Sequence, residues 1–259
     1  MAQLGQPVFL LHNGTLPKHA DRLKAEFPDI VHLTLEKNRS YSGGVNYGLE
    51  SLFLRGFDWV FILTNDCVIE KLQLPGSSPA LIAPRVYRRK KPHIDSIGAS
   101  FEPRIMHLWH QKTELDFANL TEQPRTHRVA RIPYVPGSAF WIHREIFATV
   151  GAFDELLGIY WDDVDFSARC FFLGGRIFAD IRTEILHGVS KTTAKDTMYT
   201  TYLFQRNKGI VCKRYVTGIW PRVQLELRLL AGALIRATRF LIRRDTIRFR
   251  WTLRAWIES

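Results

Sequence analysis

Short apolar segments alternate with helical ones over residues 8–63, and this alternation restricts the fold more than any other feature of the chain. Buried strands are predicted at residues 8–11, 30–35 and 57–63, with a helix at residues 15–27 between the first two. A glycine-rich loop and a second helix separate the last two strands. Strands and helices in this alternation are typical of an α/β domain with a parallel sheet.

Polar residues follow the third predicted strand, where open α/β sheets bind ligands. Asp66 is the third residue after the end of this apolar segment. The carboxyl ends of parallel strands meet at one edge of a sheet, so Asp66 is a candidate ligand for a metal or a ribose. Gly43 and Gly44 begin the preceding helix, whose N-terminus would approach a phosphate or a sugar, although a simple turn accounts for two glycines equally well.

Three aspartates, Asp162, Asp163 and Asp165, precede an apolar run and then a glycine pair. The pattern predicts a helix over residues 162–173 with the acids in its first turn. Acids in this position often only cap the helix, because its free N–H groups and its dipole favour negative charge. Adjacent carboxylates also repel one another and shift in pKa, which makes one of them a candidate general base.

Composition indicates a globular protein of a reducing compartment. The 259 residues, of which 46% are hydrophobic, suffice for one large α/β domain or for a domain with an appendage. The three cysteines, Cys67, Cys170 and Cys212, have neither disulfide nor metal-site spacing. The first residues lack the basic and long apolar segments of a signal peptide, so we expect a cytoplasmic protein.

The net charge of +11 is concentrated at the end of the chain. Residues 213–259 contain eleven basic and three acidic residues, a net charge of +8, which leaves +3 for residues 1–212. We therefore expect a folded domain over residues 1–212 and a basic tail over residues 213–259. Nucleic-acid binding would need a basic, aromatic groove, which nothing in residues 1–212 predicts.

The tail is helical in pattern from residue 221 onward. If the helix were unbroken, six arginines would share a sector of about 80° at 100° per residue, namely Arg228, Arg236, Arg239, Arg243, Arg250 and Arg254. The longest apolar run, residues 229–235, is far too short to span a bilayer. Two interpretations stay open: one helix, or two around Asp245, lying on an anionic membrane surface, and an amphipathic helix packed on the domain or on a second subunit.

The middle of the chain, residues 80–131, is interpreted as strands and loops at a sheet edge. His107 and His110 lie there without an acid or cysteine to complete a metal site, so we interpret them as solvated loop residues. The elements predicted after this region are a strand at 139–143, a short helix at 144–150 and a longer helix at 196–212. Residues 190–193 are interpreted as a loop, with phosphate contact as the alternative.

A set of short motifs occurs in the order and spacing of one enzyme family. Its residues are, in chain order, Asn38, Tyr41, Gly44, Asn46, Gly48, Asp66, Val135, Gly137, Gly151, Phe153, Asp154, Glu155, Asp162, Asp163, Asp165, Arg169 and His187. On these motifs the chain resembles family two of the glycosyltransferases, especially its bacterial rhamnosyl- and galactofuranosyltransferase branches. The resemblance implies the GT-A fold, a Rossmann-like nucleotide-sugar-binding α/β domain with a mixed, mainly parallel sheet.

The resemblance also implies roles for individual residues. Asp66 and His187 match the ligands of a divalent metal, Mg²⁺ or Mn²⁺, and oxygen ligands with one imidazole suit these ions. Asp163 matches the general base, with Asp162 beside it, and such a base in an in-line displacement predicts inversion at the sugar carbon. The residues matched to the nucleotide-sugar donor are Asn13, Asn38, Gly43, Gly44, Asn46 and Asn65, and those matched to the acceptor are Trp161, Gly137, Asp165 and Arg169.

Two departures from the family concern the donor side. Family members begin with a strand and a helix that have no counterpart before residue 8, and His12 and Thr64 stand where acids are usual. The expected function is transfer of a sugar, with inversion, from a UDP- or dTDP-sugar to a growing, lipid-linked bacterial surface polysaccharide, at the inner face of the cell membrane. The alternative is a non-catalytic carbohydrate-binding or scaffold protein of a polysaccharide assembly complex, which the missing unit would allow. A homo-oligomer is compatible with both.

Overall fold

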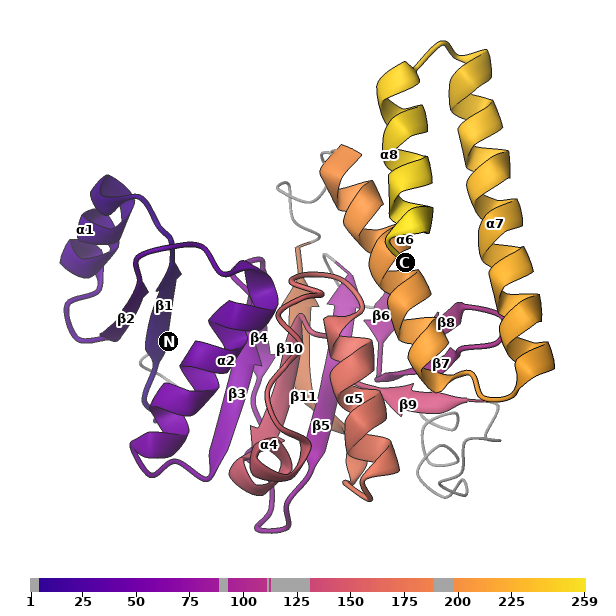
Figure 1. The fold of residues 1–259 in the computed structure, drawn as a ribbon. Coiled ribbons are helices and arrows are strands. Elements are labelled where there is room, and N and C mark those ends of the chain that lie inside the picture. The colour runs from indigo at the N-terminus through magenta and orange to yellow at the C-terminus, as the bar shows by residue number, and fades with distance from the viewer. Residues whose placement is uncertain (1–4, 89–92, 111, 113–130, 189–197) are drawn as a thin grey trace.

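The computed structural model describes residues 5–88, 93–110, 112, 131–188 and 198–259. Within these residues the chain forms seven helices and three β-sheets, and a mixed six-stranded sheet occupies the centre (Figure 1). The expected α/β class is confirmed. The loop predicted at residues 190–193, with its alternative phosphate contact, lies outside the described residues.

The N-terminal unit is the strand–helix–strand motif that the sequence predicts. β1 (Phe9–Asn13) pairs in parallel with β2 (Val31–Leu35), and α1 (Pro17–Glu26) connects them. Pro17 begins the helix, where its fixed φ is favourable and no N–H is needed. Helix α2 (Ser40–Leu54) follows and packs on both β1 and the first strand of the central sheet.

The central sheet has the strand order β3-β10-β5-β11-β4, with β6 paired to β5. Its strands are β3 (Trp59–Leu63), β4 (Cys67–Lys71), β5 (Leu81–Arg88), β6 (Ile94–Ser96), β10 (Ala139–His143) and β11 (Ile177–His187). Among the pairs described in this sheet, β5–β11 is parallel and the others are antiparallel. The expected mixed sheet is therefore confirmed, but its pairs are mainly antiparallel rather than mainly parallel, because β10, β4 and β6 each run opposite to the strands they pair with.

The turn between β3 and β4 requires the central sheet to curl. These strands lie at opposite ends of the strand order, yet residues 64–66 alone separate them along the chain. Four residue steps reach at most about 14 Å, whereas a flat sheet would place the outer two of five strands about 19 Å apart. The sheet therefore curls at this end, and residues 64–66 lie where its two edges approach each other.

A small antiparallel sheet and two helices pack around the central sheet. The strands are β7 (Ala99–Glu102), β8 (His107–His110) and β9 (Ile132–Tyr134), and the helices are α4 (Arg144–Val150) and α5 (Asp162–Phe172). The core between these layers contains fully buried large side chains, among them Leu49, Leu81, Phe101, Phe140, Ile142 and Phe166. His107 and His110 are exposed as expected, but they lie on β8, which pairs with β7, and not in a loop.

Three helices form the C-terminal part of the chain. α6 (Met198–Tyr215) runs through the predicted boundary at residue 212, and α7 (Ile219–Ile242) and α8 (Thr246–Ile257) form a hairpin that packs on it. The chain turns between α7 and α8 at Asp245. The Asp245 side chain accepts a hydrogen bond from the Arg248 N–H (2.9 Å) and caps α8.

The hairpin divides the arginine stripe predicted for an unbroken helix. Arg250 and Arg254 lie on α8, so they do not continue the row of arginines on α7. One face of α7 packs on the rest of the chain through its buried residues, which are Leu225, Leu229, Ala233 and Ala237. None of the helices in the described part of the chain has the length and apolar character needed to cross a bilayer.

Candidate active site

The turn that carries Asp66 is anchored on both sides of the curled sheet. The Thr64 N–H donates to the Ser138 carbonyl (2.9 Å) beside β10, and the Gly188 N–H, just after β11, donates to the Asp66 carbonyl (2.7 Å). The Asp66 side chain is also held, because the Thr64 hydroxyl donates to its Oδ1 (2.6 Å). Asp66 therefore lies at the sheet edge in a defined orientation.

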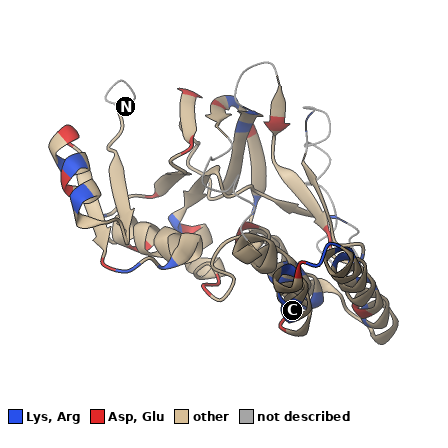
Figure 2. Cartoon of the chain, turned by 90° about the horizontal axis from the view of Figure 1, so that it is seen from above, with Lys and Arg blue, Asp and Glu red and all other residues tan. Residues whose placement is uncertain are grey.

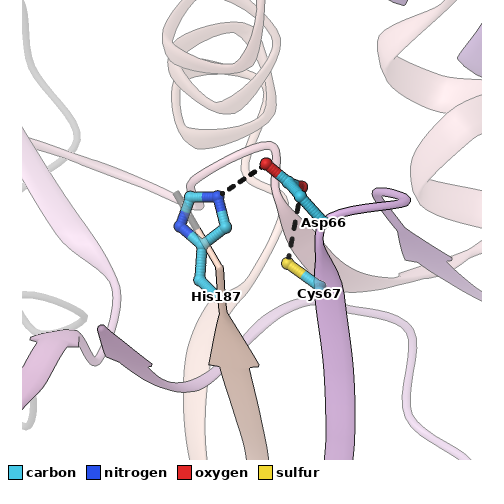
Figure 3. Close-up of side chains that lie close together, drawn as sticks. All are labelled: Asp66, Cys67 and His187. Atoms are coloured by element: carbon cyan, nitrogen blue, oxygen red, sulfur yellow. Dashed lines mark hydrogen bonds and ion pairs between the residues drawn. The ribbon is translucent and has the colours of Figure 1, made fainter. Parts of the chain in front are cut away.

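Asp66 faces His187, the last residue of β11 (Figure 3). Nε2 of His187 lies 3.3 Å from Oδ2 of Asp66, and Nδ1 of the same ring lies 3.9 Å from Oδ2 of Asp95 on β6. The two residues expected to share a metal are thus adjacent in space, although they are far apart in the sequence. A carboxylate on the other side of the ring is how proteins commonly orient a metal-binding histidine.

The charges of this cluster favour a bound cation. The Asp95 carboxylate beside the ring raises the pKa of His187, burial opposes the shift, and the charge of Asp66 adds to it. Burial opposes the ionisation of Asp66, but the hydrogen bond from Thr64 and the charge of His187 outweigh burial and lower the pKa of Asp66. Asp66 is therefore ionised at neutral pH, and a metal would take the place of the proton that these carboxylates attract to His187.

Cys67 brings a third potential ligand to the same place. One ligand atom from each of Asp66, Cys67 and His187 lies within 4.8 Å of the other two (Figure 3). Burial raises the pKa of the Cys67 thiol to about 11, against the hydrogen bond with Thr64. The thiol is therefore protonated at neutral pH, whereas thiolate is the form that binds metals. Asp66 and His187 are the residues that could hold a metal, and an oxygen with an imidazole suits Mn²⁺ or Mg²⁺.

Asp163, in the first turn of α5, lies in a tight set of contacts. Its Oδ2 accepts a hydrogen bond from the Gly137 N–H (2.8 Å), and its Oδ1 accepts one from the Val164 N–H (2.8 Å). The Gly137 carbonyl accepts a hydrogen bond from the Tyr41 hydroxyl. A Cβ at position 137 would lie 3.1 Å from that hydroxyl oxygen and 3.4 Å from Oδ2 of Asp163, so this approach favours glycine.

Asp162 lies beside Asp163 but is almost fully buried. The Ser42 hydroxyl donates to its Oδ2 (3.3 Å). Burial raises the pKa of Asp162 well above its ordinary value, and the charge of Asp163 adds to the shift. Burial also raises the pKa of Asp163, against the hydrogen bonds from Gly137 and Val164. Both carboxylates therefore hold a proton more strongly than an isolated aspartate does.

Two consecutive residues join the Asp66 turn to Asp163. The Gly137 N–H binds the Asp163 carboxylate, and the Ser138 carbonyl accepts the hydrogen bond from the start of the Asp66 turn. Because Gly137 and Ser138 share a peptide bond, both acids lie at one edge of the sheet. A cation at Asp66 and a proton acceptor at Asp163 would act on the same small region.

The chain enters α5 through two residues with unfavourable backbone angles. Tyr160 and Trp161 have φ angles of 68° and 67°, in a region that costs a non-glycine residue about 1–3 kcal/mol. Trp161, an expected acceptor-binding residue, is buried with its ring near Phe101 and Phe204. Its buried indole N–H has no hydrogen-bond acceptor within the described residues. Such strained backbone occurs mostly at functional sites.

Asp165 and Arg169, also expected at the acceptor, contact each other and the interior of the protein. Oδ2 of Asp165 accepts from Nε of Arg169 (2.9 Å), and Oδ1 accepts from the Arg214 guanidinium (2.9 Å). The other Arg169 nitrogens donate to the carbonyls of Val150 (2.7 Å) and Ala152 (2.8 Å). This network around the buried Asp165 carboxylate fixes the loop after α4 against α5 and α6. Acceptor binding by these two residues stays a prediction.

Five of the six residues expected to bind the donor gather at the start of α2, namely Asn13, Asn38, Gly43, Gly44 and Asn46. The Asn13 amide donates to the Ser40 carbonyl (2.6 Å), and its oxygen accepts from the Arg39 N–H (2.9 Å), so β1 is tied to this loop. A Cβ on Gly44 would lie 2.8 Å from the Asn13 amide nitrogen. This close packing accounts for a glycine at position 44.

Asn46 and Asn65 have different surroundings, although both are expected at the donor. Asn46 is buried, and its amide exchanges two hydrogen bonds (2.9 and 2.8 Å) with the backbone of Phe153. It therefore holds the loop after α4 against α2. Asn65, the sixth expected residue, is exposed in the turn beside Asp66.

Asp95 belongs to this cluster, but the sequence analysis did not select it. β5 lies between β6, which carries Asp95, and β11, which ends in His187. The two side chains meet because of this strand order. The alternation of residues 94–97 indicates a strand, but it carries no signal for which strands become neighbours.

No protein-family model and no curated protein matches the chain. The crystal structure of GalNAc-T7 with UDP, GalNAc and Mn²⁺ is similar, with a TM-score of 0.51 and 13% identity over 83% of this chain and 44% of that chain. The mannosyltransferase PcManGT from Pyrobaculum calidifontis, in complex with GDP-Man and Mn²⁺, gives a TM-score of 0.49 and 13% identity over 97% of this chain and 77% of that chain. The chain thus spans less than half the length of the GalNAc-T7 chain. The first of these likenesses identifies the fold, which is the GT-A fold of glycosyltransferases.

Proposed function

We propose that this chain is a metal-dependent glycosyltransferase that moves a sugar from a nucleotide-sugar donor to an acceptor hydroxyl. The proposal rests on the pairing of Asp66 with His187, next to the peptide that binds Asp163. A cation site beside a proton acceptor is what such a transfer needs. GalNAc-T7, which has a similar fold, was solved with UDP, GalNAc and Mn²⁺, and this supports the same classes of ligand here.

Asp66 and His187 are the residues that would hold Mn²⁺ or Mg²⁺. When bound, the metal neutralises negative charge on the departing diphosphate. The chain supplies a pre-oriented ligand pair, because Thr64 holds the Asp66 carboxylate and Asp95 lies against the far side of the His187 ring.

Asp163 is the proposed general base. Its raised pKa makes it a stronger proton acceptor than a free aspartate, and two backbone N–H groups hold its orientation. The acceptor hydroxyl passes its proton to the Asp163 carboxylate as its oxygen bonds to the sugar carbon. The bond from that carbon to the diphosphate breaks on the opposite side, so the sugar carbon is inverted.

The finer identity of the substrates follows from the family resemblance. We propose a UDP- or dTDP-linked rhamnose or galactofuranose as the donor and a lipid-linked bacterial surface polysaccharide as the acceptor. The enzyme would then act at the cytoplasmic face of the membrane. The support for this branch of the family is the order of Trp161, Asp162 and Asp163.

Titration calorimetry with UDP-, dTDP- and GDP-sugars tests the proposal, with Mn²⁺ present and with the metal chelated. We expect one nucleotide class to bind with Mn²⁺ and to lose its binding on chelation. Nucleotide binding that is equally strong with and without the metal would contradict the role given to Asp66 and His187. Binding of saccharides without any binding of nucleotides would instead favour a non-catalytic scaffold protein.

A further inference from the structure

The turn of the α7–α8 hairpin carries exposed aliphatic side chains. Leu241, Ile242 and Ile247 are 59%, 77% and 56% exposed. They lie on the two sides of the turn, at the end of the hairpin that Figure 1 shows far from the central sheet. We call residues 239–250 the hairpin tip. Large aliphatic side chains gathered at a projecting end mark an interaction surface.

Arginines surround these aliphatic side chains. The exposed arginines of the hairpin tip are Arg239, Arg243, Arg244, Arg248 and Arg250. Asp245 is the acid among them, and it caps α8 and pairs with Arg248 (3.5 Å). Five arginines against one aspartate give the hairpin tip a net charge of +4. Figure 2 shows basic residues along the C-terminal helices, seen from above.

A cavity of about 220 Å³ lies beside the hairpin tip, between α6, α7 and α8. Its wall includes Arg243 and Arg248 together with Tyr202 and Trp251. Guanidinium groups are the side chains best suited to bind phosphate oxygens, because each presents several N–H donors in one plane. The cavity therefore has the chemistry to receive a phosphate headgroup.

We propose that the hairpin tip docks on an anionic phospholipid bilayer, with Leu241, Ile242 and Ile247 among the acyl chains. Aliphatic side chains beside a cluster of arginines are the combination by which peripheral proteins bind such surfaces. The described helices are not able to cross a bilayer, so the contact is peripheral. A second copy of this chain is the weaker candidate, because contact between two tips would bring two charges of +4 together. This docking is independent of the proposed transfer reaction.

Co-sedimentation of the full chain with lipid vesicles tests the docking. One set of vesicles contains phosphatidylcholine alone, and the other contains phosphatidylcholine with phosphatidylglycerol. We expect the anionic vesicles to bind about tenfold or more tightly, with the difference reduced at high salt. Equal binding to the two sets would overturn the proposal.

Two variants assign the binding to the hairpin tip. Leu241→Ser/Ile242→Ser/Ile247→Ser should weaken binding about 100-fold, and Arg243→Gln/Arg244→Gln should weaken it about 30-fold. The matched controls change exposed residues elsewhere, and they are Leu16→Ser/Leu54→Ser/Leu74→Ser and Arg22→Gln/Arg55→Gln. A loss in the controls equal to the loss in the tip variants would overturn the assignment.

Light scattering separates the membrane from a second copy as the partner. A lipid-free dimer that the aliphatic triple variant converts to a monomer would overturn the proposal and assign the tip to a contact between copies. Circular dichroism melts show whether each variant is folded. If the triple variant does not fold, the arginine pair Arg243→Gln/Arg244→Gln decides, because it removes charge from exposed positions only.

Discussion

Asp66 and Asp163 lie at the same edge of the sheet, but their surroundings act on their charge in opposite directions. At Asp66, a hydrogen bond from Thr64 and the charge of His187 outweigh burial and lower the pKa. At Asp163, burial outweighs two backbone hydrogen bonds and raises the pKa. A lowered pKa suits the cation ligand that we propose at Asp66, and a raised pKa suits the proton acceptor that we propose at Asp163. Carboxylates with opposite shifts commonly divide two tasks within one active site.

The difference comes from what packs behind each acid. Asp66 lies in a turn between two strands, with a hydroxyl and an imidazole as neighbours. Asp163 lies at the N-terminus of a helix, which would lower its pKa, but the apolar core beneath α5 and the carboxylate of Asp162 lie next to it. The increase in the Asp163 pKa that desolvation causes is therefore larger than the decrease that the helix N-terminus causes.

Removing the carboxylate of Asp163 should have the largest effect. We expect Asp163→Asn to lower kcat about 10²- to 10⁴-fold, because the amide accepts no proton from the acceptor hydroxyl. The dissociation constant of the donor should change little. Steady-state kinetics and calorimetry measure the two quantities, and Asp58→Asn, at an exposed ion pair with Arg144, is the control. Full activity of Asp163→Asn would remove this residue from the role of base.

Removing the carboxylate of Asp95, which lies behind the His187 ring, should have a smaller effect. The effect concerns metal binding rather than proton transfer. Asp95→Asn weakens the orientation of the His187 ring, so we expect about tenfold weaker Mn²⁺ binding. Manganese titration followed by electron paramagnetic resonance measures this affinity. Asp180→Asn, on the same strand as His187 and paired with Arg182, is the control and should leave the affinity unchanged. The same affinity in both variants would separate Asp95 from the metal site.

The raised pKa of Asp163 should appear in the pH dependence of the wild type. The base must be deprotonated to act, so kcat should fall about tenfold for each pH unit below its pKa. Because burial raises this pKa, the fall should begin above the ordinary titration range of an aspartate. A kcat profile that stays flat into the ordinary range would contradict the assigned environment.

Replacing Asp162 should give the smallest effect, and this effect concerns the stability of the fold rather than catalysis. Folding raises its pKa, so the folded state favours the protonated form, and stability is lost as pH rises through the folded pKa. Asp162→Asn does not ionise and should therefore raise the free energy of unfolding by about 1 kcal/mol at pH 7, or Tm by about 2–4 °C. The gain should disappear below the ordinary pKa of aspartate, where the wild type is protonated in both states. Thermal melts of the wild type and the variant at about pH 3.5 and about pH 7 measure this difference in stability. A lower Tm at neutral pH would contradict the cost assigned to this buried charge.

Local elements follow from the sequence more closely than the arrangement of strands does. The predicted strand 139–143 and helix 144–150 have the bounds of β10 and α4, because the apolar run and the residues that end it are local signals. The direction of β10 in the sheet has no local signal, so the sheet was expected to be mainly parallel. The sequence left open one helix or two around Asp245, and the structure has two, so the arginine stripe of an unbroken helix does not form.

The site divides in the same way. The position of Asp66 after an apolar strand is readable from the residues, whereas its pairing with His187 was expected from a family resemblance alone. Asp95 had no such signal, since it reaches His187 through the order of three strands. The residues Trp161, Asp165 and Arg169 were expected to contact the acceptor from their place in a motif. In the structure Trp161 and Asp165 are buried, and Arg169 is hydrogen-bonded to Asp165.

Mn²⁺-dependent binding of the nucleotide-sugar, measured by calorimetry in the wild type, Asp66→Ala and Asp163→Asn, tests the division of tasks between the two acids most directly. The division predicts that Asp66→Ala loses the metal-dependent binding and that Asp163→Asn keeps it. Loss of binding in Asp163→Asn, or unchanged metal-dependent binding in Asp66→Ala, would contradict it.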